Sequence, residues 1–379
     1  MLTFDRQGRD TLGTGGCAPD RGSKTVRKLA VRREALLRRV AHAARRLLCL
    51  VVFACISVGA FCQDFSVLVR SGTPQEVQAA ISAGADVELT DFPFWKVKPS
   101  SSEVVRLYQM GSEGLTPLME AAAFNPHPEV ITVLLKAGAR IDDRDNEGGT
   151  PLMWAAEYNA NPDVVSLLLQ AGARVSDRTT MGVTALMLAA KSNSNPQVLE
   201  SLVGAAAQVQ DVDVDGYTPL MWAAENNPVP AVALALVKAG ENVNEQTKDG
   251  WTPLRFAIVS NRNPQVVSAL LEAGAYVDSR TPDGWTPLMI AAMDATGPAV
   301  VSALLKAGAA VNATTANGAT PLMLAARFNQ NPAIVLTLLA AGANAKPQDA
   351  IGKTALEYAA GNKKLIGTSA YQELKDASR

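Results

Sequence analysis

Residues 147–178 read EGGTPLMWAAEYNANPDVVSLLLQAGARVSDR, and this stretch carries the signals for two short helices. Gly148 supplies the positive φ of a tight turn, and Thr150 is placed to cap the helix that follows. Pro151 then occupies the first helical position, where no backbone N–H is required. The sequence therefore predicts a helix that begins at Pro151.

The first helix has a narrow apolar face made by Leu152, Ala155 and Ala156. Two such small side chains let neighbouring helices approach closely. Asn159 falls where a residue in the left-handed conformation would end the helix. The first helix is therefore expected to end near Asn159.

A second helix follows the same plan. Asn161 and Pro162 repeat the combination of cap and proline, and residues 164–169 supply an apolar side. The helix is expected to end at Gly172, because glycine adopts the terminating left-handed conformation without steric cost. Residues 173–180 are polar and partly β-branched, which predicts an extended finger leading to the next turn.

The same pattern recurs along the chain at one fixed spacing of 34 residues. A period of this size is typical of a solenoid, in which each unit buries its apolar face only by stacking on its neighbours. Solenoids usually present a surface rather than enclose a catalytic cavity. The threonines that start each first helix are Thr116, Thr150, Thr184, Thr218, Thr252, Thr286, Thr320 and Thr354.

A TPL helix start, two helices, a terminal Ala-Gly-Ala and a hairpin finger resemble the ankyrin repeat. The resemblance covers residues 63–379 and implies an all-α repeat solenoid of about nine repeats, including divergent caps. The period exceeds the usual 33 residues by one, a variant similar to that of exported bacterial ankyrin proteins. The extra residue lies between the helices, where asparagine replaces the usual glycine at Asn125, Asn159, Asn193, Asn227, Asn261 and Asn329.

The two ends and one finger depart from the pattern. Residues 64–87 have the spacing of a first, divergent repeat that would cap the stack. The finger after it carries a 20-residue insertion near residues 90–112, which includes Phe94 and Trp95. The last repeat has Gly361 and Asn362 in place of the Asn-Pro pair, and residues 365–378 become polar and charged, as expected for a terminal cap.

The first 62 residues form a separate leader. They contain 12 basic and 4 acidic residues, a net +8, whereas residues 63–379 contain 23 basic and 32 acidic residues, a net −9. Residues 47–62 are an uncharged run of 16 residues, shorter than the ~20 that span a bilayer. Small residues at cleavage spacing near Ala60 favour a secretory signal peptide, and a misassigned start codon would explain the long, mixed-charge residues 1–30.

The leader predicts an exported, periplasmic protein. Three alternatives stay open: a lipoprotein acylated at Cys62, a membrane-anchored protein with an uncleaved leader, and a cytoplasmic protein. All four cysteines lie in the leader, so the processed domain would have no disulfide and its stability would come from packing. They are Cys17, Cys49, Cys55 and Cys62.

Catalytic side chains are scarce. The chain has two histidines, and His127 occupies the cap position that Asn161 fills in the next repeat, so we expect it to cap a helix. After processing, the parts of a Ser-His-Asp triad, a Cys-His pair or a zinc site are missing. We therefore predict that the protein is not an enzyme and uses no cofactor.

Three acids alternate along one finger at Asp211, Asp213 and Asp215. They could hold calcium, but the later glutamate of the helix-loop-helix calcium loop is absent, which favours solvated acids on an exposed finger. No phosphate-binding glycine motif is present, and an acidic domain without a basic stripe argues against nucleic acid. The predicted partner is an unidentified protein bound by a monomer.

In proteins that resemble this one, the fingers and the exposed side of the first helices form a concave binding face. The residue between the turn glycine and the threonine is displayed there and is aromatic in three successive fingers, at Tyr217, Trp251 and Trp285. Aromatic residues are common binding hot spots. The alternative is that each ring packs on the next finger.

Two further positions vary near the end of each first helix, which fits exposure on a binding surface. By contrast, Trp154 and Trp222 occupy a position held by aliphatic residues in other repeats, and are expected in the core. Phe94 and Trp95 of the insertion are a second candidate surface. Candidate partner-binding residues at the varying positions are Phe124, Glu157, Tyr158, Met293, Arg327 and Phe328.

The leading function is therefore an exported, non-enzymatic adaptor that binds a protein partner through the finger and first-helix surface. The alternative from another class is a ligand- or metal-responsive sensor that uses the insertion at residues 90–112 or the acids of Asp211–Asp215. A cytoplasmic ankyrin adaptor is the third interpretation.

Overall fold

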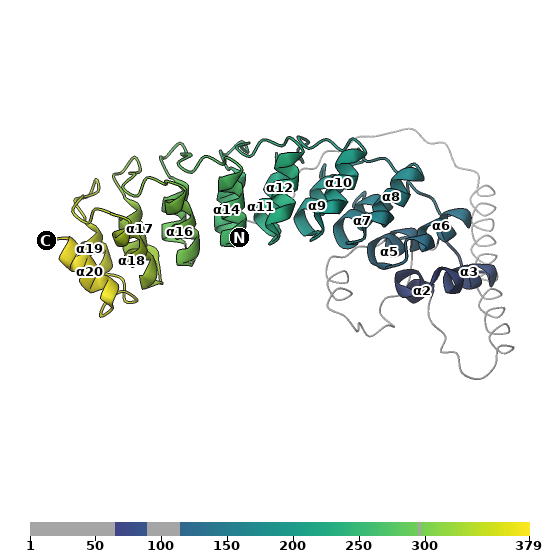
Figure 1. Ribbon diagram of the computed structural model, residues 1–379, viewed down its shortest axis with the longest axis horizontal. Helices are drawn as coiled ribbons and strands as arrows, with labels where there is room; N and C mark the ends of the chain where they lie inside the picture. Colours follow the sequence, from purple (N-terminus) through teal and green to yellow (C-terminus); the bar gives the residue numbers. More distant parts are fainter. Residues whose placement is uncertain (1–64, 89–113, 295–296) are drawn as a thin grey trace, which may run out of the picture. The chain divides into compact units, whose positions relative to one another are not determined.

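The computed structural model describes residues 65–88, 114–294 and 297–379, so the leader and the insertion lie outside the described residues. The described residues form nine helix pairs, which confirms the predicted all-α repeat solenoid (Figure 1). The first helices are α2 (Phe65–Ser71), α5 (Pro117–Phe124), α7 (Pro151–Tyr158), α9 (Ala185–Ser192), α11 (Pro219–Asn226), α13 (Pro253–Phe256) with η2 (Ala257–Asn261), α15 (Pro287–Met293), α17 (Pro321–Phe328) and α19 (Ala355–Ala359). The second helices are α3 (Pro74–Ser82), α6 (Glu129–Lys136), α8 (Pro162–Gln170), α10 (Pro196–Gly204), α12 (Pro230–Lys238), α14 (Pro264–Glu272), α16 (Pro298–Lys306), α18 (Pro332–Ala340) and α20 (Ser369–Ala377).

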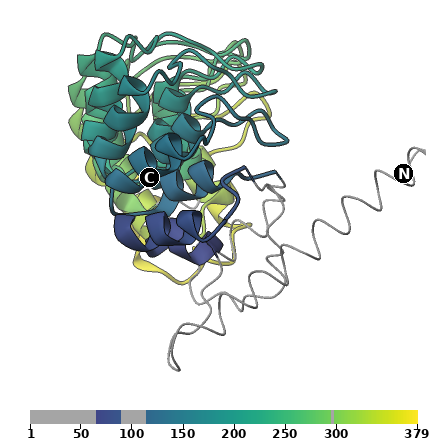
Figure 2. The same cartoon turned by 90° about the vertical axis from the view of Figure 1, so that its right-hand side faces the viewer.

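Each first helix contacts the first helix of the next repeat, and the second helices form a parallel row in the same way. The fingers that join successive repeats project to one side of the helix pairs (Figure 2). The core lies between the two rows and is built from a leucine and two alanines of most first helices with the apolar side of each second helix. Each repeat thus buries its apolar face on its neighbours.

The predicted helix signals are confirmed. Thr150 Oγ1 accepts a 3.4 Å hydrogen bond from Met153 N, and Pro151 starts α7. The turn glycine Gly148 has φ +84°, and Gly172, which follows α8, has φ +99°. Because these signals act within a few residues, they can be read locally in the sequence.

The prediction of a left-handed residue at Asn159 is wrong. Asn159 is extended, with φ −97° and ψ 116°. Its buried amide Nδ2 donates to the carbonyl oxygens of Ala122 and Asn125 in the preceding repeat, each at 3.0 Å. Its Oδ1 accepts from Asn161 N at 3.0 Å. One side chain therefore joins two repeats and also fixes the turn between α7 and α8.

This contact recurs along the array as an asparagine ladder, which we define as residues 125, 159, 193, 227, 261, 329 and 362. At the C-terminal end, Asn362 takes the ladder position one residue early and donates to Ala326 O and Asn329 O. Asparagine can form these bonds across repeats because its side-chain amide both donates and accepts, whereas glycine has no side chain to do so.

His127 does not have the predicted capping role. Helix α6 begins after Pro128, and no side-chain hydrogen bond caps it. The backbone N–H of His127 instead donates to Asn125 Oδ1 at 2.8 Å. His127 thus makes a backbone contact with the ladder residue before the helix, and α6 starts without a side-chain cap.

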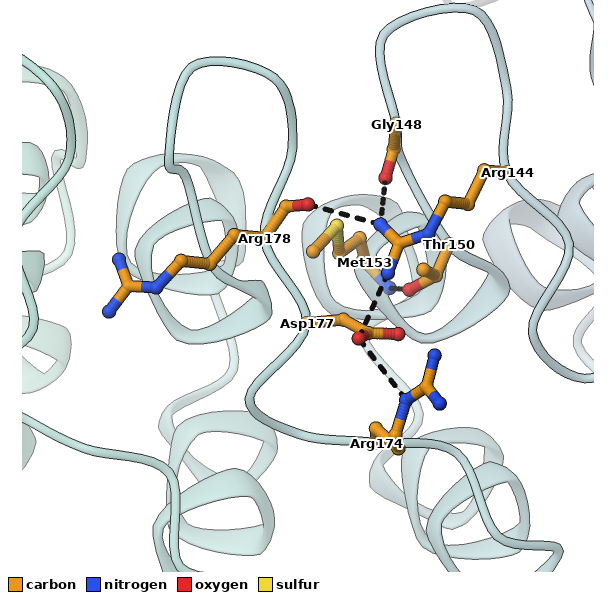
Figure 3. A network of polar contacts seen from close by, with 7 residues as sticks. All are labelled: Arg144, Gly148, Thr150, Met153, Arg174, Asp177 and Arg178. Carbon is orange, nitrogen blue, oxygen red and sulfur yellow. Dashed lines mark hydrogen bonds and ion pairs between the residues drawn. The ribbon is translucent and has the colours of Figure 1, made fainter.

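The fingers are joined by arginines, as shown in Figure 3. Arg144 donates to Gly148 O in its own finger at 2.8 Å and to Arg178 O in the next finger at 3.0 Å. It also pairs with Asp177 at 2.9 Å. Arg178 repeats this arrangement one repeat later and pairs with Asp211 at 2.7 Å. These contacts fix the spacing of neighbouring fingers.

The predicted divergent first repeat is present as α2 and α3. It is joined to the next repeat by Arg70, which pairs at 2.7 Å with the buried carboxylate of Glu120, while Ser66 Oγ donates to the same carboxylate. Within residues 65–88, 114–294 and 297–379, no helix has the length and apolar character needed to cross a bilayer.

Candidate binding cleft

A cleft of about 740 Å³ lies between two neighbouring fingers and the first helices that follow them. One wall comes from the finger before α11 and from α11 itself, and the other comes from the next finger, α13 and η2. Four aromatic residues line it: Tyr217, Trp222, Trp251 and Phe256. Its size is within the ~300–1,000 Å³ usual for ligand sites.

The four rings form a continuous chain. The ring centroids of Trp222 and Tyr217 lie 5.9 Å apart, those of Tyr217 and Phe256 lie 4.9 Å apart, and those of Phe256 and Trp251 lie 5.2 Å apart. All three contacts are tilted, the geometry that aromatic quadrupoles favour. Since Tyr217, Trp222 and Trp251 are half-buried, they keep surface available to a partner.

Trp222 is held in place by the finger. Its Nε1 donates a 3.0 Å hydrogen bond to Asp213 Oδ2, while Asp213 Oδ1 accepts from the backbone N–H groups of residues 215 and 217. The prediction that the three finger acids are solvated is thus wrong for Asp213, which is 8% exposed. The prediction that Trp222 belongs to the core is met only in part, because its half-buried ring packs against the core and also lines the cleft.

The sequence contained a signal for this contact. In the described repeats, aspartate at this finger position is always followed nine residues later by an aromatic residue with a polar hydrogen. One carboxylate oxygen of the aspartate accepts hydrogen bonds from the finger backbone, and the other accepts one from the aromatic side chain. Threonine has a single side-chain oxygen, which accepts from the finger backbone, and the residue nine positions later is then Leu, Phe or Ile. The aspartate pairs are Asp145–Trp154, Asp213–Trp222 and Asp349–Tyr358; the threonine pairs are Thr179–Leu188, Thr247–Phe256, Thr281–Ile290 and Thr315–Leu324.

The wall opposite α11 is irregular. After four residues of α-helix, the chain continues as the π-helix η2, and Arg262 ends it with φ +60°. Val259 and Ser260 of η2 line the cleft. Single π-helical turns are often found at functional sites, where they change the direction of a side chain.

A buried arginine joins this wall to the next finger. Arg255, 1% exposed, occupies the position held by methionine in six other first helices. Its guanidinium donates to Gly250 O and Ser279 O, the latter at 3.1 Å. Burial lowers the pKa of Arg255 from its usual value. These bonds tie the finger that carries Trp251 to the following one.

Carboxylates dominate the charge of the cleft, with Asp213, Asp215, Glu225 and Asp249 against a single cation, Lys248. Burial raises the pKa of the Tyr217 phenol, and nearby carboxylates, first Glu225, raise it further. Negative charge disfavours the phenolate, so the shift is consistent with the composition of the cleft.

The three aromatic finger residues predicted to bind a partner do not all lie at one site. Tyr217 and Trp251 line the cleft, whereas Trp285 packs, half-buried, in a small cluster with Met289, Ala313 and Leu324. Phe256 and Trp222 complete the cleft but had no functional prediction. Their helix position is aliphatic at Leu188, Ile290 and Leu324, and that pattern favoured a core role over a functional one.

The candidates near the N-terminal end form a separate aromatic group. Tyr158 stacks on Trp154 with centroids 5.4 Å apart and meets Phe124 at 5.7 Å. Trp154 is buried, as predicted. Glu157 lies beside Lys191, 4.0 Å from its ammonium.

The candidates of the later repeats are exposed. Arg327 stacks on Phe328 and on Tyr358, with its guanidinium 4.7 Å and 5.1 Å from the ring centroids, and Phe328 is 46% exposed. Met293 is exposed at the end of α15. Phe94 and Trp95 lie outside the described residues, so their role stays a prediction.

The alternating acids do not converge on a metal position. Asp211 pairs with Arg178, Asp213 with Trp222, and Asp215 is exposed. Among the residues that the structure describes, no group of three or more histidines, cysteines or carboxylates is arranged to hold a metal ion.

Comparison with known protein families matches the model for ankyrin repeats in three copies over residues 68–179, 175–247, 231–315, 259–349 and 294–367. The crystal structure of the human ASB11 ankyrin repeat domain is similar, with a TM-score of 0.52 and 27% sequence identity, covering 60% of this chain and 98% of that one. No curated protein matches the chain. Because the family model matches most of the sequence, the chain belongs to the ankyrin-repeat family.

Proposed function

We propose that the protein is a non-catalytic adaptor that binds a partner protein on its fingers and first helices, with the cleft of Tyr217, Trp222, Trp251 and Phe256 at the centre. Ankyrin-repeat domains generally bind proteins, and the fold is typically a non-catalytic scaffold. The observation that supports this location is the chain of four rings bordering an open cleft. Aromatic residues contribute much contact area at a small entropic cost, as binding hot spots require.

Site-specific photo-crosslinking in the native cell tests this proposal. A crosslinking residue at Lys248, which is exposed at the cleft, is expected to give discrete adducts with another protein. The matched position is Glu200, exposed on α10 in the other row of helices, where no such adduct is expected. Equal adducts at both positions, or adducts at Glu200 alone, would contradict the proposed surface.

A second pair of variants tests the rings. Trp251→Ala in the Lys248 crosslinking protein is expected to abolish the adduct, whereas Trp285→Ala, one repeat later and outside the cleft, is expected to leave it. Thermal melting of both variants establishes that each is folded. Loss of the adduct in both would assign recognition to a longer surface than the cleft.

We further propose that the adaptor is exported. The basic leader and its uncharged run of 16 residues support this location. The intact mass of the protein purified from its native cell decides between the alternatives. A start near residue 61 or 63 indicates cleavage, an added lipid mass at Cys62 indicates a lipoprotein, and an intact leader contradicts processing.

A further inference from the structure

Negative charge and aromatic faces coincide in the cleft. Asp213 accepts hydrogen bonds from Trp222 and from the backbone of its own finger. Asp215, Glu225 and Asp249 also line the cleft, but their carboxylate oxygens accept fewer or longer hydrogen bonds. The side chain of Glu225 accepts only long bonds of 3.4 Å from Asn226 and Ser260. In the described part of the chain, no ion pair joins these three carboxylates to a cation.

The rings add a second attraction for positive charge. The face of an aromatic ring carries negative potential, which is strongest for tryptophan, and attracts cations placed over it. The array already uses this contact on the outer side of the cleft, where Lys191 Nζ lies 5.3 Å from the centroid of Trp222. Trp251 and Tyr217 offer half-buried rings beside the unpaired carboxylates.

We infer that the cleft binds the guanidinium of an arginine in a basic segment of the partner protein. The inference rests on the proposed function and specifies the chemistry of its partner. Arginine fits better than lysine, because its planar group stacks on a ring while its five N–H donors reach several carboxylates. Asp215 lies on one finger, Asp249 on the next and Glu225 on α11, so acceptors surround the ring chain on more than one side.

Neighbouring repeats do not reproduce this combination. One repeat later, Thr247 replaces Asp213, Val259 replaces Glu225 and Asp294 replaces Ser260, a net loss of one acid. Ile290 replaces Phe256, so that groove also loses one ring. One repeat earlier, Lys191 takes the place of Glu225 and adds a positive charge. The 34-residue spacing therefore provides matched positions at which the same fold lacks the proposed chemistry.

Calorimetric titration of the purified full-length protein with short peptides tests the inference. The probe is an acetylated hexapeptide with two arginines among glycines, and the comparison peptides carry lysine or citrulline in place of both arginines. Citrulline keeps the shape of arginine without its charge. We expect the arginine peptide to bind about tenfold more tightly than the citrulline peptide and more tightly than the lysine peptide. Equal binding of the arginine and citrulline peptides, or of the arginine and lysine peptides, overturns the inference.

Two triple variants with the same net charge locate the site. Asp215→Asn with Glu225→Gln and Asp249→Asn is expected to weaken binding of the arginine peptide about tenfold, the combined effect of three exposed ion pairs. Glu200→Gln with Glu272→Gln and Asp283→Asn removes three exposed acids elsewhere and is expected to change it less than twofold. Equal losses in both variants indicate general attraction to an acidic protein and overturn the inference. The crosslink at Lys248 separates this result from failure of the proposed function, because an adaptor with another recognition chemistry keeps that adduct.

Discussion

Trp222 Nε1 donates a 3.0 Å hydrogen bond to Asp213 Oδ2, and this bond connects the finger before α11 to the helix after it. Because Asp213 Oδ1 meanwhile accepts from two backbone N–H groups of the finger, one carboxylate fixes both the turn and the ring. A buried carboxylate requires such partners to offset its desolvation. The orientation of the ring at the cleft therefore depends on a residue of the finger, not on its own helix.

Asp213→Thr tests this coupling. Threonine at the equivalent position, Thr247, keeps the turn bond from residue 251, so the variant removes the indole bond and the bond from the N–H of residue 215. We expect a loss of about 1–2 kcal/mol in the free energy of unfolding, since the indole N–H loses its acceptor. The double variant Asp213→Thr with Trp222→Leu reproduces the natural pair Thr179–Leu188 and is expected to lose less than the sum of its single changes. Strict additivity in urea unfolding would show that the two residues are not coupled.

Much of the fold could be predicted because its signals are local. Thr150, Pro151 and Gly172 act within one turn of the chain, and the recurrence of such residues locates most of the repeats. Asn159 was misinterpreted because asparagine suits both a left-handed residue and a hydrogen-bonding side chain. Its partners lie 34 and 37 residues earlier, and only the stacked structure brings them within reach.

The candidate site was predicted only in part for a similar reason. Tyr217 and Trp251 occupy a finger position that the period identifies as displayed, and both line the cleft. Phe256 occupies a helix position that is aliphatic in three other repeats, and its role depends on the contact with Tyr217 from the preceding repeat. The π-helix η2 could not be predicted, because the 34-residue spacing continues unchanged through it.

The asparagine ladder predicts an uneven cost of substitution. Asn193 is buried and donates to Ala156 O and Asn159 O, both at 2.9 Å, whereas Asn261, at the end of η2, is half-buried and donates to Asn227 O. Asn193→Ala leaves two buried carbonyls without this donor, and we expect a loss of about 2–3 kcal/mol. Asn261→Ala is expected to lose about half as much. Equal losses in urea unfolding would contradict a role for the ladder in joining the repeats.

The end of α10 offers a stabilising change. Ala206 has φ +68° at a position where the neighbouring repeats have Gly172 and Gly240, both with φ +99°. The left-handed conformation costs a residue with a Cβ about 1–2 kcal/mol. We therefore expect Ala206→Gly to raise the free energy of unfolding by about 1 kcal/mol. Gly172→Ala is the reciprocal control and should lower it by a similar amount, because a Cβ there meets no atom within 4 Å and only the backbone conformation opposes it. A fall in the melting temperature of Ala206→Gly would contradict the expected relief of strain.

Glu241 gives the array a pH-dependent stability. This side chain, 4% exposed, stands where the adjacent repeats have alanine, and its Oε1 accepts from Leu220 N at 2.8 Å. Burial raises the pKa of Glu241 to about 7 from 4.5, although hydrogen bonds from Thr218 and the Leu220 backbone oppose the shift. The folded state therefore holds a proton that the unfolded state releases at lower pH. Stability is highest below pH 4.5, falls as pH rises toward about 7, and then changes no further from this group.

Glu241→Gln removes the charge and keeps the acceptor for Leu220 N. At pH 8 we expect this variant to exceed the parent in free energy of unfolding by about 3 kcal/mol, the equivalent of the shift from 4.5 to about 7. At pH 4 the difference is expected to vanish, because Glu241 is protonated in both states. Urea unfolding of the two proteins between pH 4 and pH 8 measures the difference. A gap between Glu241→Gln and the parent that stays constant with pH would show that the Glu241 carboxyl has the same pKa in the folded and unfolded states, so that burial does not raise it.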